Sequence, residues 1–411
     1  MNRSVQCWIR NSFINLLIVA TLGVVLRYKI AFPLPFVDQK HLLHGHSHFA
    51  FAGWITQTLM ILLLYGISKK INEDLFKSYR TILWINLMSA YGMLIAFPLQ
   101  GYGLISISFS TLSIFNSYVF SIRLWKDMNK IKLQPTSFFW FKAALVFNFI
   151  SSIGAFSLAY LMATIKANQT SYLLSVYGYL HFQYNGWFFF VCMGLFVSKI
   201  ETWMDYTKNM NLVFWLFSLA CIPAYLLSAL WIKLPLILYA LVVLAAFAQL
   251  AGLVIFLRLI LNKTKHKLIA FPKTALVLLS LSAIALGIKI ILQTVSIIPA
   301  LSQISFGFRP IVIGYLHLML LGVISLFIIG FVLGNNLITI NRNVSIGLFV
   351  FVAGIIINEL LLMWQGIKSI SYVGIPNMNL YLLAAALVML FGLLLLNYGI
   401  INKKEEIKTT N

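Results

Sequence analysis

The sequence is short of charge, and above all of negative charge. Only 9% of its 411 residues are charged, and Asp and Glu together number 9 against 30 Lys and Arg. So few charges cannot cover the surface of a soluble globule of this size. Hydrophobic residues, in contrast, make up 61% of the chain. The composition excludes an ordinary soluble protein and predicts a membrane protein.

Cysteine is also scarce. The three cysteines, Cys7, Cys192 and Cys221, are scattered and form no C-x-x-C pair. This spacing excludes a disulfide framework and a metal site built from thiolates. The chain has no long polar linker or low-complexity stretch that would separate a soluble domain, so we expect a single integral membrane domain over residues 1–411.

Long apolar runs recur from one end of the sequence to the other. About 20 mostly apolar residues suffice for a helix to cross a bilayer. The runs are continuously apolar rather than alternating, which favours helices over a β-barrel. The first run lacks a small-residue cleavage site and is expected to be a span rather than a signal peptide. We therefore predict an all-α polytopic membrane protein of about twelve transmembrane helices, near residues 11–28, 46–68, 81–101, 103–124, 138–164, 173–198, 211–231, 235–258, 274–294, 310–334, 344–366 and 379–402.

The basic residues indicate how the chain is oriented. The net charge of +21 could suggest nucleic acid, but its distribution favours the lipid bilayer as the partner. With the N-terminus in the cytoplasm, 22 of the 30 Lys and Arg lie on the inner side and 7 on the outer side. Lys289 falls inside the ninth span, and His266 lies in a basic inner loop, where we expect it to be solvated. Both termini are thus predicted to be cytoplasmic.

The other histidines gather on three predicted spans. Spans 2, 6 and 10 all run from outside to inside, so their imidazoles are expected in one layer in the outer half of the membrane. Imidazole is costly in hydrocarbon and usually marks function or a tight polar contact. The histidines are His41, His44, His46 and His48 in HLLHGHSH, His181 in GYLHFQYNGWFF, and His317 in GYLHLMLLG.

The spacing of the first group favours two of its members as metal ligands. At about 100° per residue, His41, His44 and His48 share one helix face, whereas His46 points away. A pair at positions i and i+4, such as His44 and His48, can bind one metal ion. We favour His48 and His44 as ligands, and His41 less. The alternative is that residues 41–47 are irregular and exposed, with His48 alone buried.

Polar and small residues surround the other two histidines. Tyr177, Tyr184 and Asn185 are expected on the same helix face as His181. They could orient the imidazole or pass protons, or they could simply join helices. Glycines that would let a neighbouring helix or a flat ligand come close also flank His181 and His317: Gly178, Gly186, Gly314 and Gly322.

Two further ionisable residues are candidates for a role in the membrane. Glu359 lies within span 11 and could pair with Lys289, either as a structural ion pair or as a step in a proton relay. Arg309 lies just outside span 10, near His317. It could bind a haem propionate or anchor its helix at the interface.

The histidines on spans 2, 6 and 10 of a twelve-span protein resemble those of subunit I of the haem-copper oxidase superfamily, which includes cytochrome oxidases and membrane nitric oxide reductases. The resemblance implies that His48 (or His44) and His317 clamp a haem and that His181 binds copper or a second haem. Span 7 has no histidine and span 10 has only one, where that family has a pair on each. We therefore expect a site with fewer cofactors than in that family, with one haem alone or one haem and an incomplete copper site. A related many-span haem and copper family linked to nitric oxide stress is a second possible relative.

Three functions remain open at this point. The first is a haem-binding oxidoreductase of the bacterial cytoplasmic membrane, which would take electrons from a donor subunit or cytochrome and pass them to oxygen or nitric oxide. Tyr177, Tyr184 and Glu359 are its candidate catalytic residues. The second is a metal-ion or proton-coupled permease. The third is an assembly protein in which the histidines only pack helices.

Overall fold

The computed structural model describes residues 3–164, 168–201, 207–263 and 271–406. It is 87% helical, with no strand in the part described. Eleven helices of that part are long and apolar enough to cross a membrane, so the predicted all-α polytopic fold is confirmed. The expected span at 173–198 is helical as well, over residues 169–200, but His181 and its polar neighbours lower its hydropathy. His266 lies outside the described residues.

The chain forms two compact units. Unit 1 comprises residues 1–120 and 328–411, and unit 2 comprises residues 121–327. The candidate residues divide between them, with His41 to His48 and Glu359 in unit 1, and His181, Lys289 and His317 in unit 2.

Unit 1 contains the first helices of the chain and the last. Helices α2, η1 and α3 follow one another without a break and make one long span. Its elements are α1 (Arg3–Ala31), α2 (Gln39–Phe49), the π-helix η1 (Ala50–Thr56), α3 (Gln57–Ile71), α4 (Leu75–Gln100), most of α5 (Leu104–Met128), most of α15 (Leu326–Gly334), α16 (Arg342–Ile370) and α17 (Met378–Glu406).

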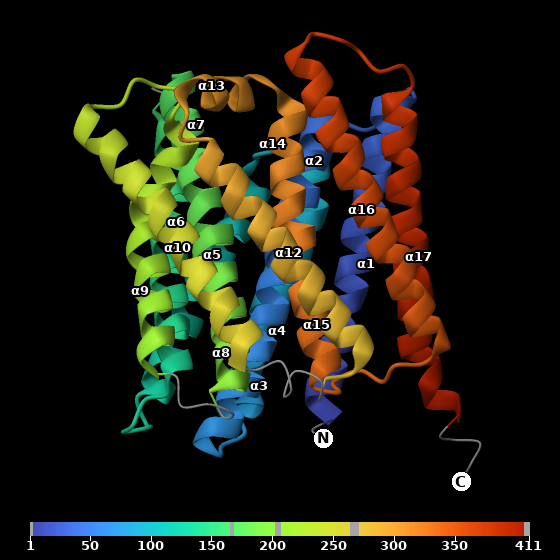
Figure 1. Ribbon diagram of the computed structural model, residues 1–411. Helices are drawn as coiled ribbons and strands as arrows, with labels where there is room; N and C mark the ends of the chain where they lie inside the picture. Colours follow the sequence, from blue (N-terminus) through green and yellow to red (C-terminus); the bar gives the residue numbers. More distant parts are fainter. Residues whose placement is uncertain (1–2, 165–167, 202–206, 264–270, 407–411) are drawn as a thin grey trace. The chain divides into compact units, whose positions relative to one another are not determined.

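Close helix contacts hold unit 1 together. Helix α17 packs against both α16 and α1 (Figure 1). Gly392 allows the approach to α16, because a Cβ there would lie 2.5 Å from the backbone nitrogen of Phe351. Asn397 of α17 donates to the carbonyl oxygen of Phe13 over 3.3 Å. This contact shows that the start of α1 and the end of α17 lie at the same end of unit 1, as the predicted topology requires.

Local signals fix where the long span begins and where α4 ends. Asp38 caps α2 by accepting a hydrogen bond from the backbone N–H of His41 over 2.8 Å. That bond holds the pKa of the Asp38 carboxyl below its usual value. Helix α4 ends at Gln100, and Gly101 turns the chain with a φ of +60°, which glycine adopts without strain. Ser106 donates to the carbonyl oxygen of Gly101 over 2.6 Å and secures this corner.

Unit 2 contains the middle of the chain. Helices α7, η2 and α8 again form one continuous span. Its elements are the end of α5, α6 (Thr136–Ala163), α7 (Gln169–His181), the π-helix η2 (Phe182–Phe188), α8 (Phe189–Ile200), α9 (Thr207–Ala224), the 3₁₀-helix η3 (Tyr225–Ala229), α10 (Leu236–Lys263), α12 (Lys273–Val295), α13 (Pro299–Gly307), α14 (Arg309–His317) and the π-helix η4 (Leu318–Ser325).

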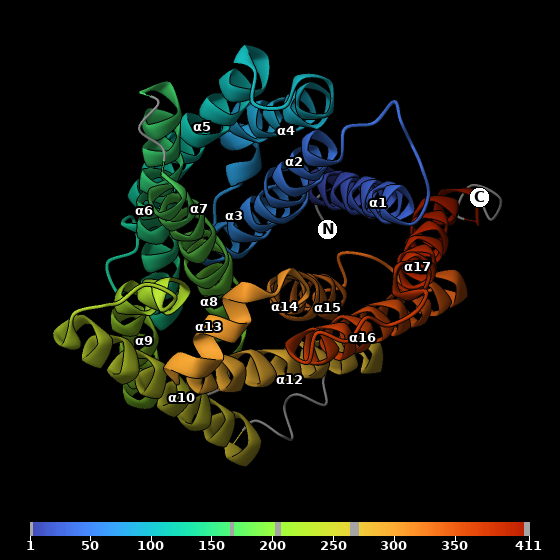
Figure 2. The ribbon, with the colours of Figure 1, turned by 90° about the horizontal axis from the view of Figure 1, so that it is seen from above.

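Packing within unit 2 brings two of the histidine-bearing spans together. Helix α6 lies along α7, η2 and α8, while α10 packs against α9 and α12. The π-helix η4 contacts both α12 and η2, and α9 and α10 lie side by side when seen from above (Figure 2). His181 and His317 therefore belong to neighbouring helices of one unit.

Polar and apolar side chains are distributed as expected for a bilayer. Large apolar side chains are exposed on the helices, among them Leu99 and Phe349, which are 78% and 76% exposed. Asn86 and Ser89 of α4 are fully buried. A surface of this kind is stable in hydrocarbon, where polar groups must find partners inside the protein. The chain is an integral membrane protein.

Candidate functional site

Three helices of the chain share one local motif. A glycine is followed three residues later by a histidine and five residues after that by a second glycine, giving G-x-x-H-x-x-x-x-G. The histidines are spaced by 133 and 136 residues. The three copies are Gly45-His48-Gly53, Gly178-His181-Gly186 and Gly314-His317-Gly322.

The motif coincides with a rare backbone feature. In each copy the α-helix passes into a π-helix one or two residues after the histidine: η1 begins at Ala50, η2 at Phe182 and η4 at Leu318. These are the π-helices of the part of the chain that the structure describes. Such segments are rare and are found most often at functional sites. Each histidine-bearing span is also the second of four consecutive long helical spans, and each such group of four spans is called a repeat below.

Side chains from neighbouring helices hold the first π-helix in place. Asn15 of α1 donates to the carbonyl oxygen of Gly53 over 2.6 Å. Asn86 of α4 donates to the carbonyl oxygen of Ala52 over 3.1 Å. Both amides are buried. Because a π-turn alters the helical hydrogen-bond pattern, these donors stabilise a backbone that would otherwise cost energy inside a membrane.

The other two π-helices receive similar support. In η4, the hydroxyl of Ser282 donates to the carbonyl oxygen of Val323 over 2.7 Å. In η2, the thiol of Cys221 lies 3.8 Å from the carbonyl oxygen of Asn185. Asn185 and Ala52 both lie four residues after the motif histidine. Cys221 of α9 thus takes the place in the second repeat that Asn86 of α4 has in the first.

His44 and His48 lie in an aromatic cluster of unit 1. The ring of His48 stacks on Phe97, with centroids 4.3 Å apart, and its Nε2 lies 3.4 Å from the hydroxyl of Tyr102. The ring of His44 meets the edge of Tyr102, with centroids 4.6 Å apart. The Nε2 atom of His44 is buried and has no hydrogen-bond partner among the residues that the structure describes. His44 and His48, the pair predicted as metal ligands, therefore both lie beside Tyr102 on one side of α2.

The other two histidines of the group, His41 and His46, point in different directions from each other. His41 lies over the turn at Gly101, where an added Cβ would be 2.5 Å from its Nε2. His46 points to the opposite side of the helix and lies against Gly23 of α1. The segment is helical from Gln39 onward, so the alternative of an irregular stretch at 41–47 is wrong.

His181 is buried in unit 2, with both ring nitrogens engaged. Its Nε2 lies 2.9 Å from the carbonyl oxygen of Cys221. A carbonyl can only accept, so Nε2 carries the proton and Nδ1 is the acceptor. The side-chain amide nitrogen of Asn185 donates to that Nδ1 over 3.1 Å. Asn185 thus contacts His181, as the spacing predicted, and the imidazole is neutral.

His317 is half-buried, and one of its ring nitrogens bonds to the backbone of its own helix. Its Nδ1 lies 2.9 Å from the carbonyl oxygen of Ile313, one turn earlier on α14. The N–H on Nδ1 therefore donates to the backbone, and the lone pair of the ring is on Nε2. This arrangement fixes the tautomer and the plane of the ring.

The tyrosines predicted beside His181 make their ring contacts elsewhere. Tyr177 packs against Phe306 of α13, with centroids 5.7 Å apart. Tyr184 is buried and meets Tyr315 of α14, with centroids 6.5 Å apart. The contact between Tyr184 and Tyr315 joins the second and third histidine-bearing spans.

The other candidate residues are distributed over both units. Arg309 is the first residue of α14 and is exposed. Glu359 is half-buried in α16, where it accepts a hydrogen bond from Asn358 over 3.1 Å. Lys289 is only 3% exposed and donates to Oε1 of Gln293 over 2.6 Å. Within the described residues of each unit, no three His, Cys, Asp or Glu side chains gather as a metal site would require.

Several glycines of the motif allow helices to pack closely. A Cβ on Gly45 would lie 2.9 Å from the ring of Pro98 in α4. One on Gly186 would lie 2.6 Å from Cβ of Phe147 in α6, and one on Gly322 would lie 3.2 Å from Cβ of Ala285 in α12. At these positions the helix-packing interpretation holds, and the space for a flat ligand is taken by a neighbouring helix.

Comparisons with known proteins add no identification. No protein-family model matches the chain, and no curated protein matches it.

Proposed function

We propose that the chain is a haem-binding redox protein, with a plan like that of subunit I of the haem-copper oxidases. The observation that carries the proposal is the motif G-x-x-H-x-x-x-x-G, present in three repeats and followed each time by a π-helix. An imidazole among apolar helices is costly and usually functional. The coincidence of a rare backbone turn with the histidine in every repeat favours a functional position over chance packing.

His317 has the geometry that an iron ligand needs. Histidines that bind metals nearly always donate their other ring N–H to a carbonyl, carboxylate or water. The bond from Nδ1 to the carbonyl oxygen of Ile313 does this and places the lone pair on Nε2. The haem would supply one-electron chemistry, and the backbone of α14 would hold the ring that binds its iron.

In unit 1, His48 is a further candidate iron ligand. Its ring is held by stacking on Phe97. Its Nε2 is 3.4 Å from the hydroxyl of Tyr102, a long hydrogen bond that a bond to iron would readily replace. We place the protein in a bacterial cytoplasmic membrane, where a cytochrome or a partner subunit would supply electrons.

His181 does not fit a copper ligand as it stands. Its Nε2 carries a proton toward the carbonyl oxygen of Cys221, and its Nδ1 accepts from Asn185. Neither nitrogen offers a lone pair to a metal ion. The proposal therefore contains haem and no copper at His181.

An absorption spectrum of the purified protein, oxidised and then reduced with dithionite, tests the proposal together with iron, copper and zinc analysis. We expect Soret and α bands with stoichiometric iron after expression in a haem-replete host. His317→Ala and His48→Ala should lose the bands, whereas His46→Ala, which alters the side facing α1, should keep them. A colourless wild-type protein without iron would refute the proposal, and copper or zinc in its place would favour a metal permease.

A further inference from the structure

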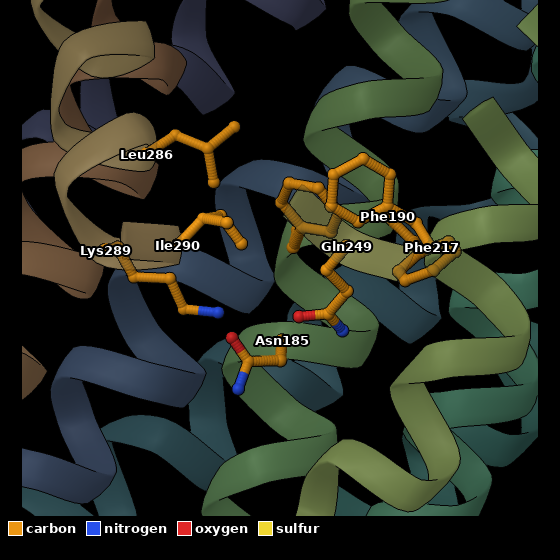
Figure 3. Close-up of a pocket in the computed structure, with 8 residues that line it drawn as sticks. Asn185, Phe190, Phe217, Gln249, Leu286, Lys289 and Ile290 are labelled. Atoms are coloured by element: carbon orange, nitrogen blue, oxygen red, sulfur yellow. The ribbon is translucent and has the colours of Figure 1, made fainter. Parts of the chain in front are cut away.

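A small cavity in unit 2 adjoins the buried Lys289. Its volume is about 10 Å³, and its walls come from η2, α8, α9, α10 and α12. Most of the walls are apolar, with polar groups from Lys289, Asn185 and Gln249 (Figure 3). A volume of this size holds one water molecule.

The orientation of Asn185 follows from its neighbours. The carbonyl oxygen of Cys221 makes Nε2 of His181 a donor and Nδ1 an acceptor. Asn185 must therefore turn its amide nitrogen toward His181 and its oxygen away. In Figure 3 that oxygen points toward the Lys289 amine.

The oxygen of Asn185 lacks a protein partner. Asn185 is 7% exposed, and its Oδ1 is buried without a hydrogen bond within the described residues. A buried acceptor in this state costs about 1–3 kcal/mol. Native proteins commonly satisfy such groups with a bound water.

Lys289 has donors to spare. An ammonium has three N–H groups, and within the described part of unit 2 its amine bonds only to Gln293. Gln293 in turn donates to Oε1 of Gln249 over 2.5 Å. Among the titratable groups of unit 2, His181 on α7 and Cys221 on α9 are close enough to sense the charge of Lys289. From α10 comes the neutral Gln249, and η4 contains no titratable residue.

We propose that this cavity is a binding site for one water molecule, which accepts a hydrogen bond from Lys289 and donates one to Oδ1 of Asn185. The water completes a chain of hydrogen bonds from Gln249 through Gln293 and Lys289 to Asn185 and His181. These hydrogen bonds join α10 and α12 to the motif helix, and the water gives the buried amine a second polar partner. The inference goes beyond the proposed function and needs no haem.

Infrared difference spectra in H₂¹⁶O and H₂¹⁸O test the site directly. We expect an O–H stretching band that shifts with the oxygen isotope in the wild-type protein. It should persist in Gly287→Ala, since that glycine of α12 has nothing within 4 Å of an added Cβ. It should be lost in Lys289→Met and in Asn185→Leu. If one of these two variants does not fold, the other decides the test.

A second measurement uses the thiol of Cys221, which lies 3.9 Å from Nε2 of His181. Its S–H stretching band, assigned with Cys221→Ser, should shift in Lys289→Met and return toward the wild-type position in Lys289→Arg. A cryo-electron microscopy map should also show a density peak between Nζ of Lys289 and Oδ1 of Asn185. An empty cavity, or an isotope-sensitive band that survives in both variants, would overturn the proposal.

Discussion

The side-chain nitrogen of Asn15 on α1 lies 2.6 Å from the carbonyl oxygen of Gly53, a residue of the π-helix η1. The side-chain oxygen of Asn15 accepts a hydrogen bond from the hydroxyl of Tyr91 over 2.9 Å. One buried amide thus joins α1, η1 and α4. The π-helix is held by partners outside its own helix, and those partners can be removed one at a time.

Replacing Asn15 by leucine should destabilise unit 1. The variant loses the buried hydrogen bond to Gly53 and the part-buried one from Tyr91. The carbonyl oxygen of Gly53 is left without this donor, which costs about 1–3 kcal/mol for the unpaired group. Denaturant titration of the protein in detergent would measure the loss. Thr21→Val is the matched control on α1, because its hydroxyl is exposed and donates to the carbonyl oxygen of Leu17 within the same helix. If the two variants lost the same free energy of unfolding, the bond from Asn15 to Gly53 would stabilise unit 1 no more than the exposed bond of Thr21 does.

Replacing Gly186 by alanine should destabilise the second repeat. The added Cβ would lie 2.6 Å from Cβ of Phe147, so α6 and η2 would have to separate. Overpacking of this kind costs about 1–3 kcal/mol. Gly287→Ala, with open space around it, should instead stabilise its helix by roughly 0.5–1 kcal/mol. The prediction fails if the melting temperatures of the two variants move in the same direction.

Replacing Gly101 by alanine should strain the corner between α4 and α5. The residue has a φ of +60°, and the new Cβ would also press on the ring of His41. We expect a loss of about 1–3 kcal/mol from the backbone alone. Gly374→Ala in the loop before α17 is the control, since nothing lies within 4 Å of its added Cβ. An unchanged unfolding curve for Gly101→Ala would contradict the assigned turn.

The cap at Asp38 should make part of the stability of unit 1 depend on pH. The backbone N–H of His41 lowers the pKa of this carboxyl below its ordinary value of 3.8. A lowered folded-state pKa gives stability that is complete above the ordinary value and is lost as the pH falls through the folded-state value. Asp38→Ala should therefore melt below the wild type at pH 7, and the difference should shrink in acid.

Asp38→Ser serves as the control for that prediction. A serine hydroxyl can cap the helix without a charge, so the melting temperature of this variant should follow the pH less steeply than that of the wild type. A difference between wild type and Asp38→Ala that stays constant from pH 7 into acid would count against the carboxylate cap.

Composition and hydropathy were sufficient to predict the helical membrane fold, because continuous apolar runs of about 20 residues have the length and polarity of helices that cross a bilayer. Helical spacing also predicted that His41, His44 and His48 share a face and that His46 points away. It predicted the contact between Asn185 and His181 for the same reason. These are local relations, and a regular helix fixes them within a few residues.

The three-repeat pattern was in the sequence but could not be interpreted from the histidines alone. Gly45 and Gly53 have no obvious role until Gly178, Gly186, Gly314 and Gly322 are aligned with them. The π-helices follow no simple sequence rule, since FAFAG, FQYNG and LMLLG differ in composition. Their support comes from neighbouring helices, as the bonds of Asn15 and Asn86 show, and such long-range partners are not visible in local spacing.

The number of helices in each repeat has a consequence for how the chain inserts into a membrane. Four is an even number, so a segment with four spans begins and ends on the same side of the bilayer. Copies joined end to end then all insert with the same orientation, and no loop charge has to be reversed between them. A histidine near the outer end of the second helix of one copy will lie near the outer end in every copy. Duplication of a single small segment could therefore have placed all three imidazoles on one side of the membrane.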